Sequence, residues 1–225
     1  MTEILKGSSF SNHLKPNKLI FLLHGYGDNA NNFINIGKVI DTSAWSAHYI
    51  ALNAPNHILN YPSGFEWFNL YPNGIYISNA GTKEIKIIEE QVNESLLKIE
   101  KTLKFYIDKF KLLLSDCIVI GFSQGGMMTF EIGNYLKDRL GGLAILSGRI
   151  MHEAPITNLN LLKTPIFISH GDKDDVLSFN NFNNSIEYLK SNKFNFESHV
   201  LEGDTHIIST KTINLLQKFI KKTMM

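Results

Sequence analysis

Ser123 lies in the run Gly121-Phe-Ser-Gln-Gly125, in which a glycine stands two residues before it and two residues after it. This Gly-x-Ser-x-Gly spacing allows a sharp turn between a strand and a helix, which lifts a serine hydroxyl above the end of a parallel sheet. The apolar run Cys117–Ile120 comes before the turn, and the helical stretch Met127–Lys137 comes after it. Because the turn has the flanks that it needs, we interpret Ser123 as a nucleophile.

A serine hydroxyl attacks poorly until a base takes its proton, and the base needs a carboxylate that orients it. In folds that use this turn, the acid and then the histidine follow the serine along the chain. His206 ends the short loop Glu202-Gly-Asp-Thr-His206 that follows the expected strand Phe194–Leu201, and it fits the base. A polar turn after Ile166–Ser169 offers three candidate acids: Asp172, Asp174 and Asp175. Spacing alone does not choose among them.

The oxyanion of an acyl-transfer reaction needs two hydrogen-bond donors. One is expected from the backbone N–H of Gln124, the residue after the nucleophile, and the other from an early strand-to-helix loop. The run His24-Gly-Tyr-Gly27 fits that loop, and its glycines allow the N–H of Tyr26 to turn inward. His24 precedes Ser123, so we expect a structural role for it, and His170 is placed to support the acid turn by hydrogen bonding.

Short apolar runs alternate with helical patterns along the chain, which predicts an α/β fold with a mostly parallel central sheet flanked by helices on both faces. Strands are expected at Leu19–Leu23, Tyr49–Leu52, Ile118–Ile120, Leu143–Leu146, Ile166–Ser169 and Phe194–Leu201. Helices are expected at Phe33–Ile40, Glu84–Phe110, Met127–Lys137, Phe182–Lys190 and Ile207–Lys222. Nothing in the composition marks a boundary, so we expect one domain over residues 1–225.

The segment Asn53–Gly81 does not fit this alternation, because it is long and rich in proline, glycine, asparagine and aromatic residues. Loops of this length inside compact domains are usually functional or disordered, and aromatic side chains argue against disorder. Two interpretations stay open: the aromatic residues cap an edge of the core, or they form a wall of a substrate pocket. Trp67 and Phe68 are the candidates for that wall.

The composition excludes several classes of function. With a net charge of +1, the chain has no bulk attraction to nucleic acid or to an anionic membrane. One cysteine cannot form an intramolecular disulfide, and the longest early apolar run, Leu19–Leu23, is too short to span a bilayer. We therefore expect a cytoplasmic protein that binds no nucleic acid and does not insert stably into a membrane.

Four motifs together resemble the carboxylesterase/acyl-protein thioesterase (phospholipase/carboxylesterase) family of α/β-hydrolases. They are His24-Gly-Tyr-Gly-Asp28, Gly121-Phe-Ser-Gln-Gly-Gly126, His170-Gly-Asp-Lys-Asp174 and Gly203-Asp-Thr-His206. The resemblance implies an α/β-hydrolase fold, Asp174 as the acid, and oxyanion donors on Tyr26 and Gln124. It implies a small-molecule ester or an acylated substrate, and a homodimer, since relatives often form dimers.

The reaction expected from these residues is cleavage of carboxylic esters by a Ser-His-Asp acyl-enzyme mechanism, which needs no metal or organic cofactor. One alternative is an acyl-protein thioesterase or lysophospholipase that takes long acyl chains. A second is an enzyme like the dienelactone hydrolases, which use a cysteine; for Cys117 a buried role in the core is favoured. A third is a non-catalytic binding protein with a hydrolase fold, against which the intact set of Ser123, Asp174 and His206 argues.

Overall fold

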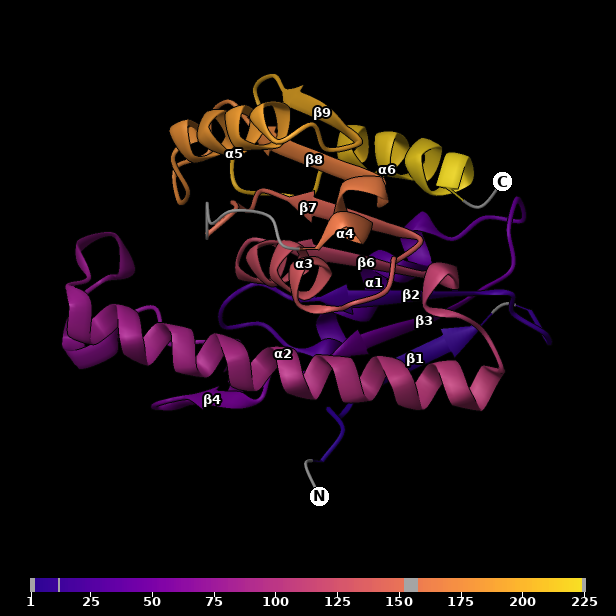
Figure 1. The fold of residues 1–225 in the computed structure, drawn as a ribbon, viewed down its shortest axis with the longest axis horizontal. Helices are drawn as coiled ribbons and strands as arrows, with labels where there is room; N and C mark the ends of the chain where they lie inside the picture. Colours follow the sequence, from indigo (N-terminus) through magenta and orange to yellow (C-terminus); the bar gives the residue numbers. More distant parts are fainter. Residues whose placement is uncertain (1–2, 12, 152–157, 224–225) are drawn as a thin grey trace.

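The computed structural model describes residues 3–11, 13–151 and 158–223. In this part of the chain, seven strands form one sheet in the order β1-β3-β2-β6-β7-β8-β9, which runs from bottom to top in Figure 1. All neighbouring strands are parallel except β1, which pairs antiparallel with β3 at one edge. The strands are β1 (Gly7–Ser11), β2 (Lys18–Leu23), β3 (Ala47–Leu52), β6 (Cys117–Phe122), β7 (Gly142–Leu146), β8 (Ile166–Gly171) and β9 (Phe196–Leu201).

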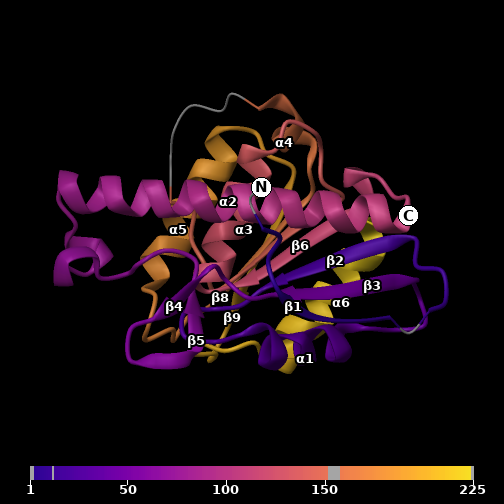
Figure 2. The same ribbon diagram turned by 90° about the horizontal axis from the view of Figure 1, so that it is seen from below.

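Helices cover both faces of this sheet (Figures 1 and 2). One face carries α2 (Thr82–Phe110), α3 (Gln124–Tyr135), the short α4 (Leu159–Lys163) and α5 (Phe179–Ser191), and the other carries α1 (Ala30–Ile40) and α6 (Thr210–Thr223). The predicted fold class is therefore confirmed, and each predicted strand and helix overlaps one in the structure.

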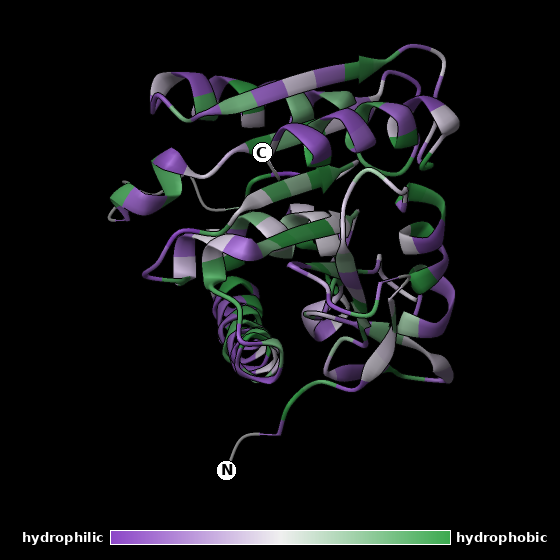
Figure 3. Cartoon of the chain, turned by 90° about the vertical axis from the view of Figure 1, so that its right-hand side faces the viewer, coloured by the Kyte–Doolittle hydropathy of each residue, from purple (hydrophilic) through white to green (hydrophobic). Residues whose placement is uncertain are grey.

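The core consists of two apolar layers, because successive side chains of a strand point to opposite faces of a sheet. In β2, Leu19, Phe21 and Leu23 pack under α2 and α3, whereas Ile20 and Leu22 pack under α1 and α6. Because both of their sides are covered, the inner strands of the sheet are mainly apolar, and they form the hydrophobic centre of the molecule in Figure 3.

The sequence pattern did not predict the short helix α4, the strand β1 or the elements within Asn53–Gly81. Strand β1 has the polar sequence Gly-Ser-Ser-Phe-Ser and alternates between exposed and half-buried residues, as an edge strand can. The segment Asn53–Gly81 begins with a two-stranded hairpin of β4 (Asn56–Ile58) and β5 (Tyr61–Glu66), and short 3-10 turns follow at Pro72–Gly74 and Ile77–Asn79. Strand β1 and the segment Asn53–Gly81 both lie outside the parallel core. Apolar periodicity is weak in such segments, so their sequence gives little signal of their structure.

Candidate active site

Ser123 occupies the junction between β6 and α3 with φ of 53° and ψ of −116°, a conformation that is strained for a residue with a side chain. Its backbone N–H donates to the Leu146 carbonyl at the end of β7 over 2.9 Å. A Cβ on Gly125 would lie 2.0 Å from the Leu23 carbonyl oxygen, and one on Gly121 would lie 2.1 Å from that of Gly125. The two glycines thus permit the close approach of strand and helix that holds Ser123 in this turn.

The expected base and acid meet across two loops at the same edge of the sheet. His206 Nδ1 donates to Asp174 Oδ2 over 2.7 Å. A carboxylate only accepts hydrogen bonds, so this contact places the proton of a neutral imidazole on Nδ1 and leaves Nε2 as the acceptor. His206 and Ser123 line one cavity, and the ring of His206 packs on that of Phe122 with a centroid separation of 4.8 Å.

The Asp174 side chain is fully buried and has four hydrogen-bonding or ionic contacts. Oδ1 accepts from the backbone N–H groups of Val176 and Leu177 over 2.9 and 2.8 Å. Oδ2 lies 3.1 Å from His170 Nε2, which also donates to the Leu177 carbonyl over 2.8 Å. Burial is the main cause that lowers the pKa of His170, so the ring is neutral and supports the acid as a hydrogen-bond donor.

The other two aspartates of this turn take different positions. Asp172 Oδ1 accepts from the Gly203 N–H over 2.7 Å and so joins the acid loop to the histidine loop. A Cβ on Gly171 would lie 2.2 Å from the Asp204 carbonyl oxygen, so this glycine lets the two loops pack closely. Asp175 is exposed at the rim of the cavity. Of the three candidates, only Asp174 contacts His206 among the described residues.

The loop of Tyr26 lies against the turn of Ser123. A Cβ on Gly25 would lie 3.4 Å from the Ser123 Cβ, and the buried His24 ring fixes the start of the loop. His24 Nδ1 donates to the Gly25 carbonyl over 2.7 Å, while Nε2 accepts from the Ala54 N–H over 3.1 Å. Within the described residues, the backbone N–H groups of Tyr26 and Gln124 have no hydrogen-bond acceptor, which leaves them available to a ligand.

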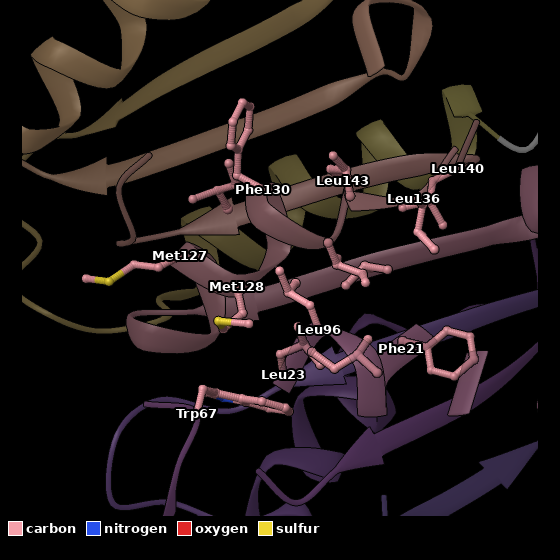
Figure 4. Close-up of a cluster of buried hydrophobic side chains, with 14 of the residues drawn as sticks. Phe21, Leu23, Trp67, Leu96, Met127, Met128, Phe130, Leu136, Leu140 and Leu143 are labelled. Carbon is pink, nitrogen blue, oxygen red and sulfur yellow. The ribbon is translucent and has the colours of Figure 1, made fainter. Parts of the chain in front are cut away.

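The cavity over Ser123 has a volume of about 730 Å³, within the range of small-molecule sites. Its walls are mainly apolar or aromatic and include Leu70, Tyr71, Tyr76, Ile77, Met127, Val176 and Leu177. Trp67 and Phe68 differ from the expectation, because both side chains are fully buried and neither lines the cavity. Trp67 belongs to the same buried cluster as Leu23 and Leu96 (Figure 4). The segment's later residues form the pocket wall, while its middle caps the core.

Comparison with known proteins decides the family. A family model described as Phospholipase/Carboxylesterase matches residues 9–224. The chain belongs to this family. It is 28% identical over 228 residues to "Acyl-protein thioesterase 1 homolog 1" of Dictyostelium discoideum, an alignment that covers 98% of this chain and 97% of the relative. It is also 28% identical over 218 residues to "Acyl-protein thioesterase 1" of Saccharomyces cerevisiae, an alignment that covers 91% of this chain and 92% of the relative.

Solved structures share the fold of this phospholipase/carboxylesterase chain. The crystal structure of esterase PE8 superposes with a TM-score of 0.82 at 23% identity and covers 98% of this chain and 100% of that one. The Bacillus cereus carboxylesterase superposes with a TM-score of 0.75 at 17% identity and covers 96% of this chain and 93% of that one. The family and its fold make this chain a hydrolase of the carboxylesterase/thioesterase type.

Two further observations describe this family member. Among the described residues, no three histidine, cysteine, aspartate or glutamate side chains are grouped so that they could hold a metal ion. In the same part of the chain, no helix has both the length and the apolar character needed to cross a lipid bilayer.

Sequence reasoning missed two side chains of the site. The Gln124 side chain accepts from the Trp67 N–H over 2.9 Å and donates to the Phe68 carbonyl over 2.7 Å, so it fixes the segment Asn53–Gly81 beside the nucleophile. Arg149 lines the cavity from the loop after β7. Neither residue belongs to a recognisable motif for these roles, although Arg149 is one of only two arginines in a chain whose other basic residues are lysines.

Proposed function

We propose that this chain hydrolyses carboxylic esters through an acyl-enzyme formed on Ser123, with His206 as the base and Asp174 as the residue that orients it. The observation that carries the proposal is the 2.7 Å hydrogen bond from His206 Nδ1 to the buried Asp174 Oδ2, in a cavity that Ser123 also lines. A base held in this tautomer has Nε2 free to accept the proton of the serine hydroxyl, as serine hydrolysis requires.

In the first step, Ser123 Oγ attacks the ester carbonyl carbon while His206 Nε2 takes the hydroxyl proton. The carbonyl oxygen becomes an oxyanion that accepts from the N–H groups of Tyr26 and Gln124. When the carbon–oxygen bond to the leaving group breaks, His206 returns the proton to the departing alcohol. Water then attacks the acyl-enzyme with the same base, which releases the acid and restores Ser123.

A fluorophosphonate probe tests this function. We expect stoichiometric labelling of the wild type, together with turnover of a simple nitrophenyl ester. Ser123→Ala should lose both the labelling and the turnover. Labelling and turnover equal to the parent in Ser123→Ala would overturn the assignment, and a folded wild type with neither activity would favour a non-catalytic binding protein.

A second candidate is hydrolysis of long-chain thioesters on acylated proteins, or of lysophospholipids. The similarity to relatives named acyl-protein thioesterase 1 favours it, as do the apolar walls of the cavity. A series of nitrophenyl esters with increasing acyl length, measured beside the matching thioesters, separates the candidates. A rise of kcat/KM with chain length supports long acyl groups, whereas a maximum at short chains supports small esters.

A further inference from the structure

Arg149 stands on a fixed part of the wall of the Ser123 cavity. It follows Leu146 by three residues, and the Leu146 carbonyl accepts the backbone N–H of Ser123 over 2.9 Å. On its other side, the backbone N–H of Ile150 donates to Ser185 Oγ of α5 over 3.0 Å. Because hydrogen bonds fix the backbone before and after Arg149, this residue is held in a defined position in the cavity wall.

The Arg149 guanidinium has a buried hydrogen-bond donor that no described residue accepts. Its Nη1 donates to Asn181 Oδ1 over 3.3 Å, and its Nε is buried without a hydrogen-bond partner among the described residues. No carboxylate in this part of the chain forms an ion pair with it. An arginine stays protonated at neutral pH, and Arg149 is half-buried, so the part of its charged group that is removed from water without a counter-ion costs free energy. The arrangement therefore favours an anion supplied from outside the chain.

The surroundings of Arg149 strengthen such an ion pair. Apolar side chains such as Ile77 and Met127 line the same cavity, and a low-dielectric wall increases the attraction between opposite charges. Asp175 also lines the cavity, but its side chain is exposed at the rim and makes no ion pair with Arg149. The Asn181 amide is held by its own bond from Nδ2 to the Ser178 carbonyl over 3.1 Å, which directs Oδ1 to the guanidinium.

We propose that Arg149, oriented by Asn181, is a specificity-determining residue that binds a carboxylate on the substrate, away from the scissile ester. This inference rests on the proposed ester hydrolysis at Ser123. The planar fork of a guanidinium matches the two oxygens of a carboxylate, and one guanidinium neutralises one negative charge. The preferred substrates are then monoanionic esters whose carboxylate lies within reach of Arg149 when the carbonyl is at Ser123.

The test compares nitrophenyl esters whose acyl chain ends in a carboxylate with the isosteric esters that end in a carboxamide. Short, medium and long chains are measured, with the spontaneous hydrolysis subtracted. We expect wild-type kcat/KM to favour the carboxylate by about 10- to 100-fold at the best chain length, the range of a hydrogen-bonded charge pair. Arg149→Met should abolish this preference, and Arg149→Lys, which keeps the charge without the fork, should retain part of it.

Arg139→Met is the matched control, because it removes the same charge from an exposed position outside the cavity. It should keep the full preference. A wild type without preference for the carboxylate, or a preference that persists in Arg149→Met, overturns the subsite. If the wild type cleaves carboxamide esters without preferring carboxylates, ester hydrolysis stands and only the subsite fails. If it cleaves no ester and takes no fluorophosphonate, the proposed function fails and the subsite with it.

Discussion

His206 Nδ1 and Asp174 Oδ2 lie 2.7 Å apart although 32 residues separate them in the chain. The contact forms because β8 and β9 are parallel neighbours, so the loops that follow them leave the same edge of the sheet. Asp174→Asn would keep the shape of the side chain but favour the wrong tautomer of His206. We expect kcat for a nitrophenyl ester to fall by about 10³- to 10⁴-fold with little change in KM, as measured by steady-state kinetics.

Asp175→Asn is the control for that substitution, since it changes the same type of side chain one residue away at an exposed position. It should retain most of the activity. If Asp175→Asn lost more activity than Asp174→Asn, Asp175 would be the acid and the assignment of Asp174 would be wrong. The loop would then have to rearrange when substrate binds.

Cys117 should be dispensable and unreactive. It begins β6, whereas Ser123 follows the end of that strand, so roughly 16–20 Å of extended chain separates the two residues. Burial raises the pKa of the Cys117 thiol to about 12, so almost no thiolate exists at neutral pH. We expect no reaction with a thiol reagent in the native protein and full ester hydrolysis by Cys117→Ala. If Cys117→Ala folded but no longer hydrolysed the ester, Cys117 would have to be considered as the nucleophile.

Gly125→Ala should be strongly destabilising. The added Cβ would lie 2.0 Å from the Leu23 carbonyl oxygen and 2.6 Å from that of His24, both of which are backbone atoms that cannot move alone. We expect a loss of more than about 3 kcal/mol in the free energy of unfolding, measured by urea denaturation. At Gly126 the nearest atom would be 3.2 Å away, so Gly126→Ala should cost far less. Equal losses would contradict the packing argument.

The turn of Ser123, the position of His206 and the loop that carries the three candidate aspartates could be anticipated because each depends on local sequence. Each lies just after an apolar strand, and the carboxyl ends of parallel strands meet at one edge. Spacing could not choose among the three aspartates, since that choice depends on how the backbone of Val176 and Leu177 folds back to bind Oδ1.

The walls of the cavity could not be anticipated in the same way. Trp67 is buried among distant segments, and its backbone N–H donates to the Gln124 side chain 57 residues away, a contact that no local pattern indicates. Arg149 gave no signal as a site residue, because its surroundings come from α5 and from the segment Asn53–Gly81. Contacts between distant segments determine which side chains face the substrate and which enter the core.

The free energy of unfolding should fall as the pH is lowered from about 7.5 to about 5.5. Burial is the main cause that lowers the pKa values of His24, His48 and His170 below the ordinary histidine value of 6.5. The unfolded chain therefore binds more protons in this range, and stability present above pH 6.5 is lost below it. Urea titrations at a series of pH values measure the effect, and a flat profile would contradict it.

Glu66 acts in the opposite direction and provides the matched variant for that measurement. Burial raises the pKa of Glu66 from 4.5 to about 6. Between pH 6 and pH 4.5 the carboxylate of Glu66 therefore binds a proton more readily in the folded protein than in the unfolded chain. Glu66→Gln removes this contribution. The fall in stability between pH 6 and pH 4.5 should then become steeper than in the wild type.

Gln124 should hold the segment Asn53–Gly81 in place through its side chain, in addition to the oxyanion role that we propose for its backbone N–H. Gln124→Ala leaves the Trp67 N–H and the Phe68 carbonyl buried without their partner. Each such group costs about 1–3 kcal/mol, so the free energy of unfolding should fall by about 2–6 kcal/mol. Ester turnover should fall as well, because the segment carries Tyr76 and Ile77 of the cavity wall.

Gln91→Ala is the matched control, since the Gln91 side chain makes one half-buried bond to the same segment, accepting from the Asn69 N–H over 2.7 Å. It should cost only about 1 kcal/mol, because water can replace a partner at a half-buried site. Urea denaturation and kcat/KM are measured on both variants. If Gln124→Ala were no more destabilising than Gln91→Ala, the two bonds of Gln124 would not hold the segment. The packing of Trp67 and its other buried hydrogen bonds, to the His24 carbonyl and from Ser95 Oγ, would then have to do so.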